Sequence, residues 1–257
     1  MYHFLSQQGV DEDHETLQWE TPSQMALSCG TAHLSQYDVQ LIAESLLFTP
    51  LHLAVAMADF SVDNLTSILE REYANVDAID KLGATALHWA SMQGNAEAIT
   101  LLLRWKANVN LPDLGGSPAL HGACASGSVQ SVELLLAAGA NVNTPCKRGR
   151  TALFWLDNSG EAIINLIVQR CANLNSLNYR GETALHQAAQ RDDRHSIISS
   201  LIEAGANFNV QDANGYTPTL AAISQSRQRS VDVLVASAKE TDVSVTHFLA
   251  LALVRHP

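Results

Sequence analysis

One six-residue pattern recurs along this 257-residue chain and constrains its fold more than any other feature. The pattern reads T-P-L-H-L-A from Thr49 to Ala54 and T-A-L-H-W-A from Thr85 to Ala90. Four further copies, some of them looser, begin at Pro118, Thr151, Thr183 and Thr217. Successive copies begin 36, 33, 33, 32 and 34 residues apart. Self-similarity at a nearly fixed period of this length indicates a structural unit that is stacked on copies of itself.

Two further markers keep the same period. An Ala-Asn pair, followed by an apolar residue and then Asn or Asp, begins at Ala74, Ala107, Ala140, Ala172 and Ala206. A glycine stands two residues before the start of the six-residue pattern, at Gly83, Gly116, Gly149, Gly181 and Gly215. Glycine permits the positive φ of a tight turn, and threonine caps the N-terminus of a helix. Each unit is therefore predicted to hold a turn and then a helix.

A second helix is predicted in each unit. Apolar residues recur there at helical spacing, for example Val132, Leu135 and Leu136. Gly139 and Gly205 follow two of these helices and are predicted to end them in the left-handed conformation. No single unit can bury its own apolar face, so stacking must supply the core.

The pattern resembles the ankyrin repeat, whose signature is T-P-L-H-x-A with a period near 33. The resemblance covers six units over about residues 46–238 and implies an all-α solenoid of helix-turn-helix units joined by short hairpin loops. Repeats two, three and five match the signature closely. Repeat four departs from it most, because F-W-L-D from Phe154 to Asp157 stands where the family has His-x-Ala-Ala.

The repeats leave an extension at each end of the chain. We expect an acidic N-terminal arm over residues 1–35, a capping helix over 36–46, six repeats over 47–238, and a C-terminal capping helix or degenerate repeat over 239–257. The net charge is −11, and the first 70 residues hold ten acidic residues and no Lys or Arg. This negative net charge argues against non-specific binding of nucleic acid, which requires a basic surface.

Catalytic, metal and cofactor sites are not expected. The four cysteines, Cys29, Cys124, Cys146 and Cys171, show no CxxC spacing, which favours a reduced protein of the cytoplasm or nucleus. The chain shows no secretory signal, no membrane-spanning apolar run and no common catalytic motif, so we expect neither a membrane-spanning protein nor an enzyme. We also expect a monomer. Four histidines share one repeat position, and the resemblance implies a structural hydrogen bond to a neighbouring hairpin for each: His52, His88, His121 and His186.

The resemblance also implies where a partner binds, because family members use hairpin tips and the outward face of the first helix of each repeat. Carried onto this sequence, those positions predict partner-binding residues at Trp89, Met92, Gln93, Ser126, Lys147, Arg148, Arg150, Trp155, Asn158, Tyr179, Arg180, Gln187, Arg191 and Tyr216. Basic residues greatly outnumber acidic ones at such positions. We therefore predict a protein-interaction adaptor that binds an acidic or phosphorylated segment of a partner through its concave face.

Two alternatives remain open from the sequence. Trp89 and Trp155 flank repeat three and would border a recess with a floor of small residues, or they would simply pack between neighbouring helices. Asp157 would cap the turn that follows it, or it would act in that recess. A small-molecule binder or atypical enzyme using the recess with Asp157 is the alternative to the adaptor, and the chain could also be a piece of a longer scaffold.

Overall fold

The computed structural model describes residues 46–56, 61–71, 75–156 and 160–239. Within these ranges every regular element is a helix, and β-structure is limited to isolated bridges such as that between Ile79 and Thr85. The predicted all-α solenoid of paired helices is therefore confirmed. The described residues fall into two compact units that divide between Lys147 and Arg148, and each unit is described by itself.

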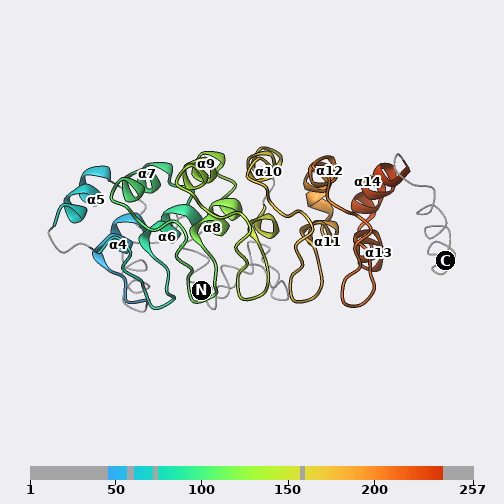
Figure 1. The fold of residues 1–257 in the computed structure, drawn as a ribbon, viewed down its shortest axis with the longest axis horizontal. Coiled ribbons are helices and arrows are strands. Elements are labelled where there is room, and N and C mark those ends of the chain that lie inside the picture. Colours follow the sequence, from blue (N-terminus) through green and yellow to red (C-terminus); the bar gives the residue numbers. More distant parts are fainter. Residues whose placement is uncertain (1–45, 57–60, 72–74, 157–159, 240–257) are drawn as a thin grey trace, which may run out of the picture. The chain divides into compact units, whose positions relative to one another are not determined.

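The first unit holds three helical pairs, drawn from blue to green in Figure 1. The pairs are α4 (Pro50–Ala56) with α5 (Val62–Leu69), α6 (Ala86–Met92) with α7 (Ala96–Arg104), and α8 (Ala119–Ser126) with α9 (Val129–Ala137). The first helices pack in the order α4, α6, α8, and the second helices pack in the order α5, α7, α9. The unit is thus two layers of helices with the core between them.

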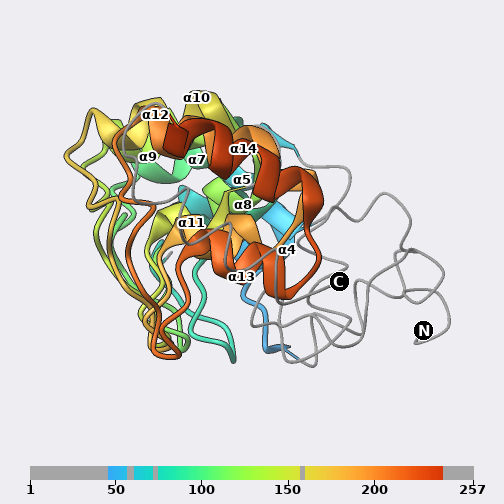
Figure 2. The same cartoon turned by 90° about the vertical axis from the view of Figure 1, so that its right-hand side faces the viewer.

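The second unit continues the pattern with η1 (Ala152–Trp155) and α10 (Gly160–Val168), α11 (Ala184–Ala189) and α12 (His195–Glu203), and α13 (Pro218–Ser224) and α14 (Gln228–Lys239). Between α11 and α12 the chain makes a single 3-10 turn, η2 (Asp192–Arg194). In this unit, too, α11 packs on α13, and α12 packs on α10 and α14. Figure 2 shows the hairpin loops that precede α11 and α13 projecting away from the helices.

Small residues let the first helices approach closely. Leu87 and Leu120 are buried at the same position of α6 and α8. A Cβ placed on Gly122 of α8 would lie 2.6 Å from Cγ of Met92 on α6, a distance that real Cβ atoms do not adopt. Glycine at this position therefore lets the Met92 side chain rest directly on the backbone of α8.

The predicted helix ends at Gly139 and Gly205 are confirmed, with φ of 91° and 96°. Lys106 and Cys171 occupy the corresponding position in two other repeats, and they adopt the same left-handed region with φ of 66° and 58°. Residues other than glycine rarely adopt this backbone conformation. The repeat geometry therefore imposes the conformation even where the sequence offers no glycine.

Repeat four lacks a full first helix. Its four-residue 3-10 turn, η1, ends at Trp155, and Leu156 is extended with φ −65° and ψ 134°. Leu156 is buried at the position where Ala90 and Ala123 stand in other repeats. A side chain of that size does not fit the close approach of the first helices, which accounts for the short turn. Asp157 and Asn158, the arm over 1–35 and the proposed end segments at 36–45 and 240–257 lie outside the described residues.

Candidate functional site

Successive hairpin tips within each unit are hydrogen-bonded to one another. In the second unit the Tyr179 N–H donates to the Arg148 carbonyl over 3.0 Å, and the Ala213 N–H donates to the Arg180 carbonyl over 3.0 Å. In the first unit the Leu114 N–H donates to the Leu82 carbonyl over 2.8 Å in the same register. The tips within each unit therefore form a ladder with fixed spacing.

The acidic residues at the start of the tips point into the loops. Oδ1 of Asp80 accepts from the N–H groups of Leu82 and Ala84 at 2.8 and 2.9 Å, and Oδ1 of Asp212 accepts from those of Asn214 and Tyr216, both at 2.8 Å. These carboxylates hold the hairpin conformation.

Four of the predicted residues are exposed at the tips of the second unit. Arg148 and Arg180 are exposed, Tyr179 has 79% of its surface exposed and Tyr216 has 44%. Lys147, the last residue of the first unit, is also exposed. These positions agree with the sequence-based prediction of an accessible tip surface, and whether they bind a partner stays a proposal.

Arg150 differs from the other predicted tip cations. Only 9% of its surface is exposed, and its guanidinium carbon lies 5.9 Å from the centre of the half-buried Trp155 ring. This distance is within the range of a cation–π interaction. Arg150 therefore packs against the irregular turn of repeat four, and it lacks the exposure that the sequence predicted for a partner-binding residue.

Trp89 and Met92 are placed differently from the expectation. Trp89 is fully buried, its indole N–H donates to Oδ2 of Asp80 over 2.9 Å, and its ring contacts the Phe48 ring edge-on with centroids 5.0 Å apart. Met92 has 9% of its surface exposed. A side chain without exposed surface cannot contact a partner, so Trp89 is a core residue and does not border an open recess.

Predicted residues near the ends of the first helices are half-buried and engaged with the fold. The side-chain amide of Gln93 donates to the Ala56 carbonyl at 3.5 Å, and the Ser126 hydroxyl donates to the Ala123 carbonyl at 2.9 Å. Gln187 is half-buried on α11. Gln93 therefore joins two neighbouring repeats, whereas Ser126 bonds to its own helix. Asn158 lies outside the described residues.

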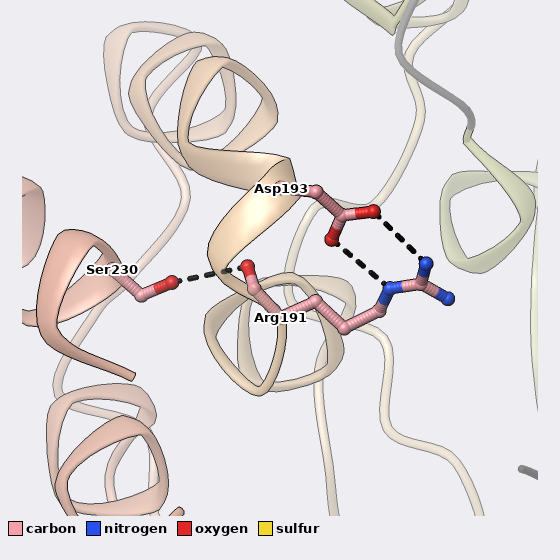
Figure 3. Close-up of polar contacts among 3 residues, drawn as sticks. All are labelled: Arg191, Asp193 and Ser230. Carbon is pink, nitrogen blue, oxygen red and sulfur yellow. Dashed lines mark hydrogen bonds and ion pairs between the residues drawn. The ribbon is translucent and has the colours of Figure 1, made fainter. Parts of the chain in front are cut away.

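Arg191 forms an ion pair that the sequence analysis missed. Its Nε and Nη2 donate to the two carboxylate oxygens of Asp193 at 3.1 and 2.9 Å, and its carbonyl accepts from the Ser230 hydroxyl at 3.1 Å (Figure 3). The bonds from Arg191 lower the pKa of Asp193. The positive charge of Arg191 is therefore compensated locally. The sequence could have indicated this ion pair, because Arg191 and Asp193 carry opposite charges and stand two residues apart.

The structural role predicted for the repeated histidines is confirmed. Nδ1 of His186 lies 2.8 Å from the Thr183 hydroxyl, and its Nε2 lies 3.0 Å from the Tyr216 carbonyl of the next hairpin. His52 and His88 make the same two contacts with their own threonines and with Ala84 and Ser117. In repeat three, Nε2 of His121 lies 3.1 Å from the Thr144 carbonyl.

Burial keeps several of these groups uncharged. It lowers the pKa values of His52 and His88 and lowers that of His121 to about 4. It also raises the pKa of the Cys124 thiol to about 12. Among the described residues, no group of three or more His, Cys, Asp or Glu side chains could hold a metal ion, and no helix is long and apolar enough to cross a membrane.

These features define a helical repeat protein with exposed basic and aromatic side chains at its hairpin tips. The family described as ankyrin repeats, in three copies, matches residues 25–113, 51–146 and 156–247. The chain therefore belongs to the ankyrin-repeat family. The stretch between the last two matches, residues 147–155, holds the tip of repeat four and η1, where the structure departs from a regular repeat.

Individual relatives agree with this assignment. The chain is 30% identical to ankyrin repeat protein 14 of vaccinia virus over 99 residues, which is 34% of this chain and 41% of that protein. It is 36% identical to neurogenic locus notch homolog protein 1 of Homo sapiens over 88 residues, which is 34% of this chain and 3% of that protein. The chain thus spans less than half the length of these relatives.

A solved structure is similar over most of the chain. It is the predatory endopeptidase of Bdellovibrio bacteriovorus in complex with an immunity protein, and one of its chains matches with a TM-score of 0.65 and 26% identity. The match covers 74% of this chain and 98% of that chain.

Proposed function

We propose that this chain is a protein-interaction module that binds an acidic or phosphorylated segment of a partner, and that it has no catalytic role. The observation that carries the proposal is the charge of the hairpin tips. Lys147, Arg148 and Arg180 are all exposed there. A protein of net charge −11 thus exposes basic side chains at these hairpin tips.

Family membership supports a role in binding proteins. Ankyrin repeats generally mediate contacts between proteins. The similar solved chain belongs to a complex of two proteins, which also favours partner binding. The tips add two exposed rings, Tyr179 and Tyr216, and aromatic and arginine side chains are enriched among the residues that dominate binding energy.

The alternative role as a small-molecule binder or atypical enzyme loses its main support. It required Trp89 to face a recess with Trp155, and Trp89 is fully buried against Asp80 and Phe48. Trp155 is half-buried beside Arg150, and Asp157 lies outside the described residues.

We place the protein in the cytoplasm or nucleus and expect it to act as a monomer. Cys124, Cys146 and Cys171 are free cysteines, as expected in a reducing compartment. Light scattering on the purified protein would test the monomer, since a dimer would double the mass.

An array of synthetic peptides tests the proposed function. Acidic, phosphorylated, neutral and basic 12-residue peptides are probed with the full chain and with the double variant Arg148→Glu/Arg180→Glu. We expect the wild type to retain acidic and phosphorylated peptides and the variant to lose them. Arg229→Glu is the matched control, because Arg229 is exposed on α14 and away from the tips. Equal retention of basic peptides by the wild type would contradict the proposal.

A further inference from the structure

Arg148 and Arg180 occupy the same position in consecutive hairpins of the second unit. Each is the second residue after the one that opens the tip, Cys146 in one hairpin and Asn178 in the next. Each also offers its carbonyl to an N–H of the following tip, at 3.0 Å in both cases. The backbone positions that carry the two arginine side chains are therefore equivalent and lie one repeat apart along the row of hydrogen-bonded tips.

Tyr179 lies between the two arginines. It precedes Arg180 in the chain, and its N–H is bonded to the Arg148 carbonyl. Its ring rests over the adjacent glycine, since a Cβ on Gly149 would lie 3.0 Å from Cδ1 of Tyr179. Even so, 79% of the surface of Tyr179 is exposed. Along the backbone of the tips, Tyr179 therefore stands between the positions of the two arginines.

The spacing of these groups selects a conformation of the ligand. Packed helices lie about 8–10 Å apart, so equivalent positions of adjacent repeats differ by about that distance. A polyproline II segment rises about 3.1 Å per residue with three residues per turn, so residues i and i+3 share a face about 9 Å apart. In a β-strand, residues i and i+3 point to opposite faces.

We propose that these tips bind a polyproline II segment of the partner that carries anionic side chains at positions i and i+3. The arginine forks of Arg148 and Arg180 pair with the two anions, because the planar guanidinium matches carboxylate and phosphate groups. Tyr179 packs on the residues between the anions, where proline fits best because aromatic surfaces dock polyproline II segments. This inference rests on the proposed function and specifies the ligand of the same surface.

A spacing series of labelled peptides tests the inference by fluorescence anisotropy with the full chain. Each 12-residue proline-rich peptide carries two glutamates at a separation of two, three, four or five residues, and a second set carries phosphoserines. We expect the tightest binding at a separation of three, by about fivefold over the others, which corresponds to about 1 kcal/mol for an exposed charge pair. Stronger binding of the phosphoserine set would identify phosphate as the preferred anion, and equal or weaker binding would identify carboxylate.

Single variants then assign the contacts. We expect a loss of affinity of about fivefold or more for each of three variants, Arg148→Gln, Arg180→Gln and Tyr179→Ala. A loss of this size is typical of a residue that contributes substantially to the binding energy. Arg229→Gln, an exposed change on α14, should leave binding unchanged. A charge exchange gives the register: Arg180→Glu should bind a peptide in which lysine replaces one glutamate, and replacement of the other glutamate should not restore binding.

The outcomes separate this inference from the proposed function. Acidic peptides that bind equally at every separation would overturn the polyproline II register and leave the acidic-partner proposal standing. No binding of any acidic or phosphorylated peptide would reject both. Tighter binding of a single-stranded oligonucleotide than of every peptide would also overturn the inference, because it would make phosphate backbone the ligand.

Discussion

The indole N–H of Trp89 donates a 2.9 Å hydrogen bond to Oδ2 of Asp80, and both side chains are buried. Oδ1 of Asp80 meanwhile accepts from Leu82 and Ala84, so this carboxylate joins helix α6 to the hairpin before it. A buried carboxylate is costly unless hydrogen bonds compensate it. Trp89 therefore contributes to the stability of repeat two through a specific polar contact as well as through its ring.

Replacing Trp89 by Phe should lower the free energy of unfolding by about 1–3 kcal/mol, because the change leaves a buried acceptor without one of its donors. Urea denaturation measures the loss. Trp105→Phe is the matched control, since Trp105 is 41% exposed at the end of α7 and an exposed change usually costs less than about 0.5 kcal/mol. Equal costs for the two variants would show that the bond to Asp80 does not stabilise the fold.

Core truncation tests the stacking of the first unit. Leu120 is fully buried on α8, so Leu120→Ala should destabilise the chain by about 2–5 kcal/mol, the range for a leucine that leaves a cavity. Leu114→Ala serves as the comparison, because Leu114 is 61% exposed at a hairpin tip. A cost at Leu120 as small as that at Leu114 would mean that the register of this helix is wrong.

The sequence predicted those parts of the fold that depend on local chemistry repeated at a fixed period. The glycine at each tip, the threonine cap and the histidine three residues later all contribute backbone or short-range contacts, so their roles follow from spacing alone. His186 illustrates this, since it bonds its own cap at Thr183 and one carbonyl of the next repeat.

The site was less predictable, because exposure depends on partners distant in the sequence. A helix position does not reveal whether a wide ring tilts inward, and Trp89 does so because Asp80, nine residues earlier, accepts its N–H. Likewise Arg150 is buried with its guanidinium group beside the Trp155 ring. The position of Trp155 follows from the short 3-10 turn of repeat four. Arg148 and Tyr179 are exposed at the tips, as their positions in the repeat predicted, and a role in partner binding stays a prediction.

Stability should fall as the pH is lowered from about 7 to 4. The pKa of buried His121 is lowered to about 4, and burial also lowers the pKa values of His52 and His88. An unfolded histidine titrates near about 6.5, so between these values the unfolded chain binds protons that the folded chain excludes. The stabilising effect of neutral His121 is complete above about pH 6.5, and its loss by pH 4 is on the order of 3 kcal/mol.

Urea midpoints measured from pH 7.5 to 4 check this dependence. His121→Gln cannot take up the proton and should show a shallower decline than the wild type over that range. His195→Gln is the control, because His195 is exposed at the start of α12, and its decline should match the wild type. Parallel curves for the wild type and His121→Gln would contradict the prediction.

Cys171→Gly should stabilise the protein by about 0.5–1 kcal/mol. Cys171 has a φ of 58°, and relief of that conformation outweighs the entropy that glycine loses on folding. The reverse change, Gly205→Ala, places a Cβ at the same repeat position, where φ is 96° and no atom beyond the chain neighbours lies within 4 Å of that Cβ. It should destabilise by about 1 kcal/mol through backbone strain alone. Thermal unfolding of both variants measures the effects, and a loss of stability in Cys171→Gly would show that its thiol makes a favourable contact.

Association with an acidic peptide should slow as salt is added. Exposed charges steer encounter, and salt screens them over about 8 Å at physiological ionic strength. Stopped-flow measurements should show slower association of the wild type at high salt, and in low salt the Arg148→Glu/Arg180→Glu variant should associate more slowly than the wild type. Arg150 is unsuitable for this test, because reversal of a buried cation beside Trp155 would disturb repeat four. Arg229→Glu changes the net charge by the same amount per site without touching the tips, so equal slowing by both kinds of variant would assign the effect to overall charge and reject steering by the tips.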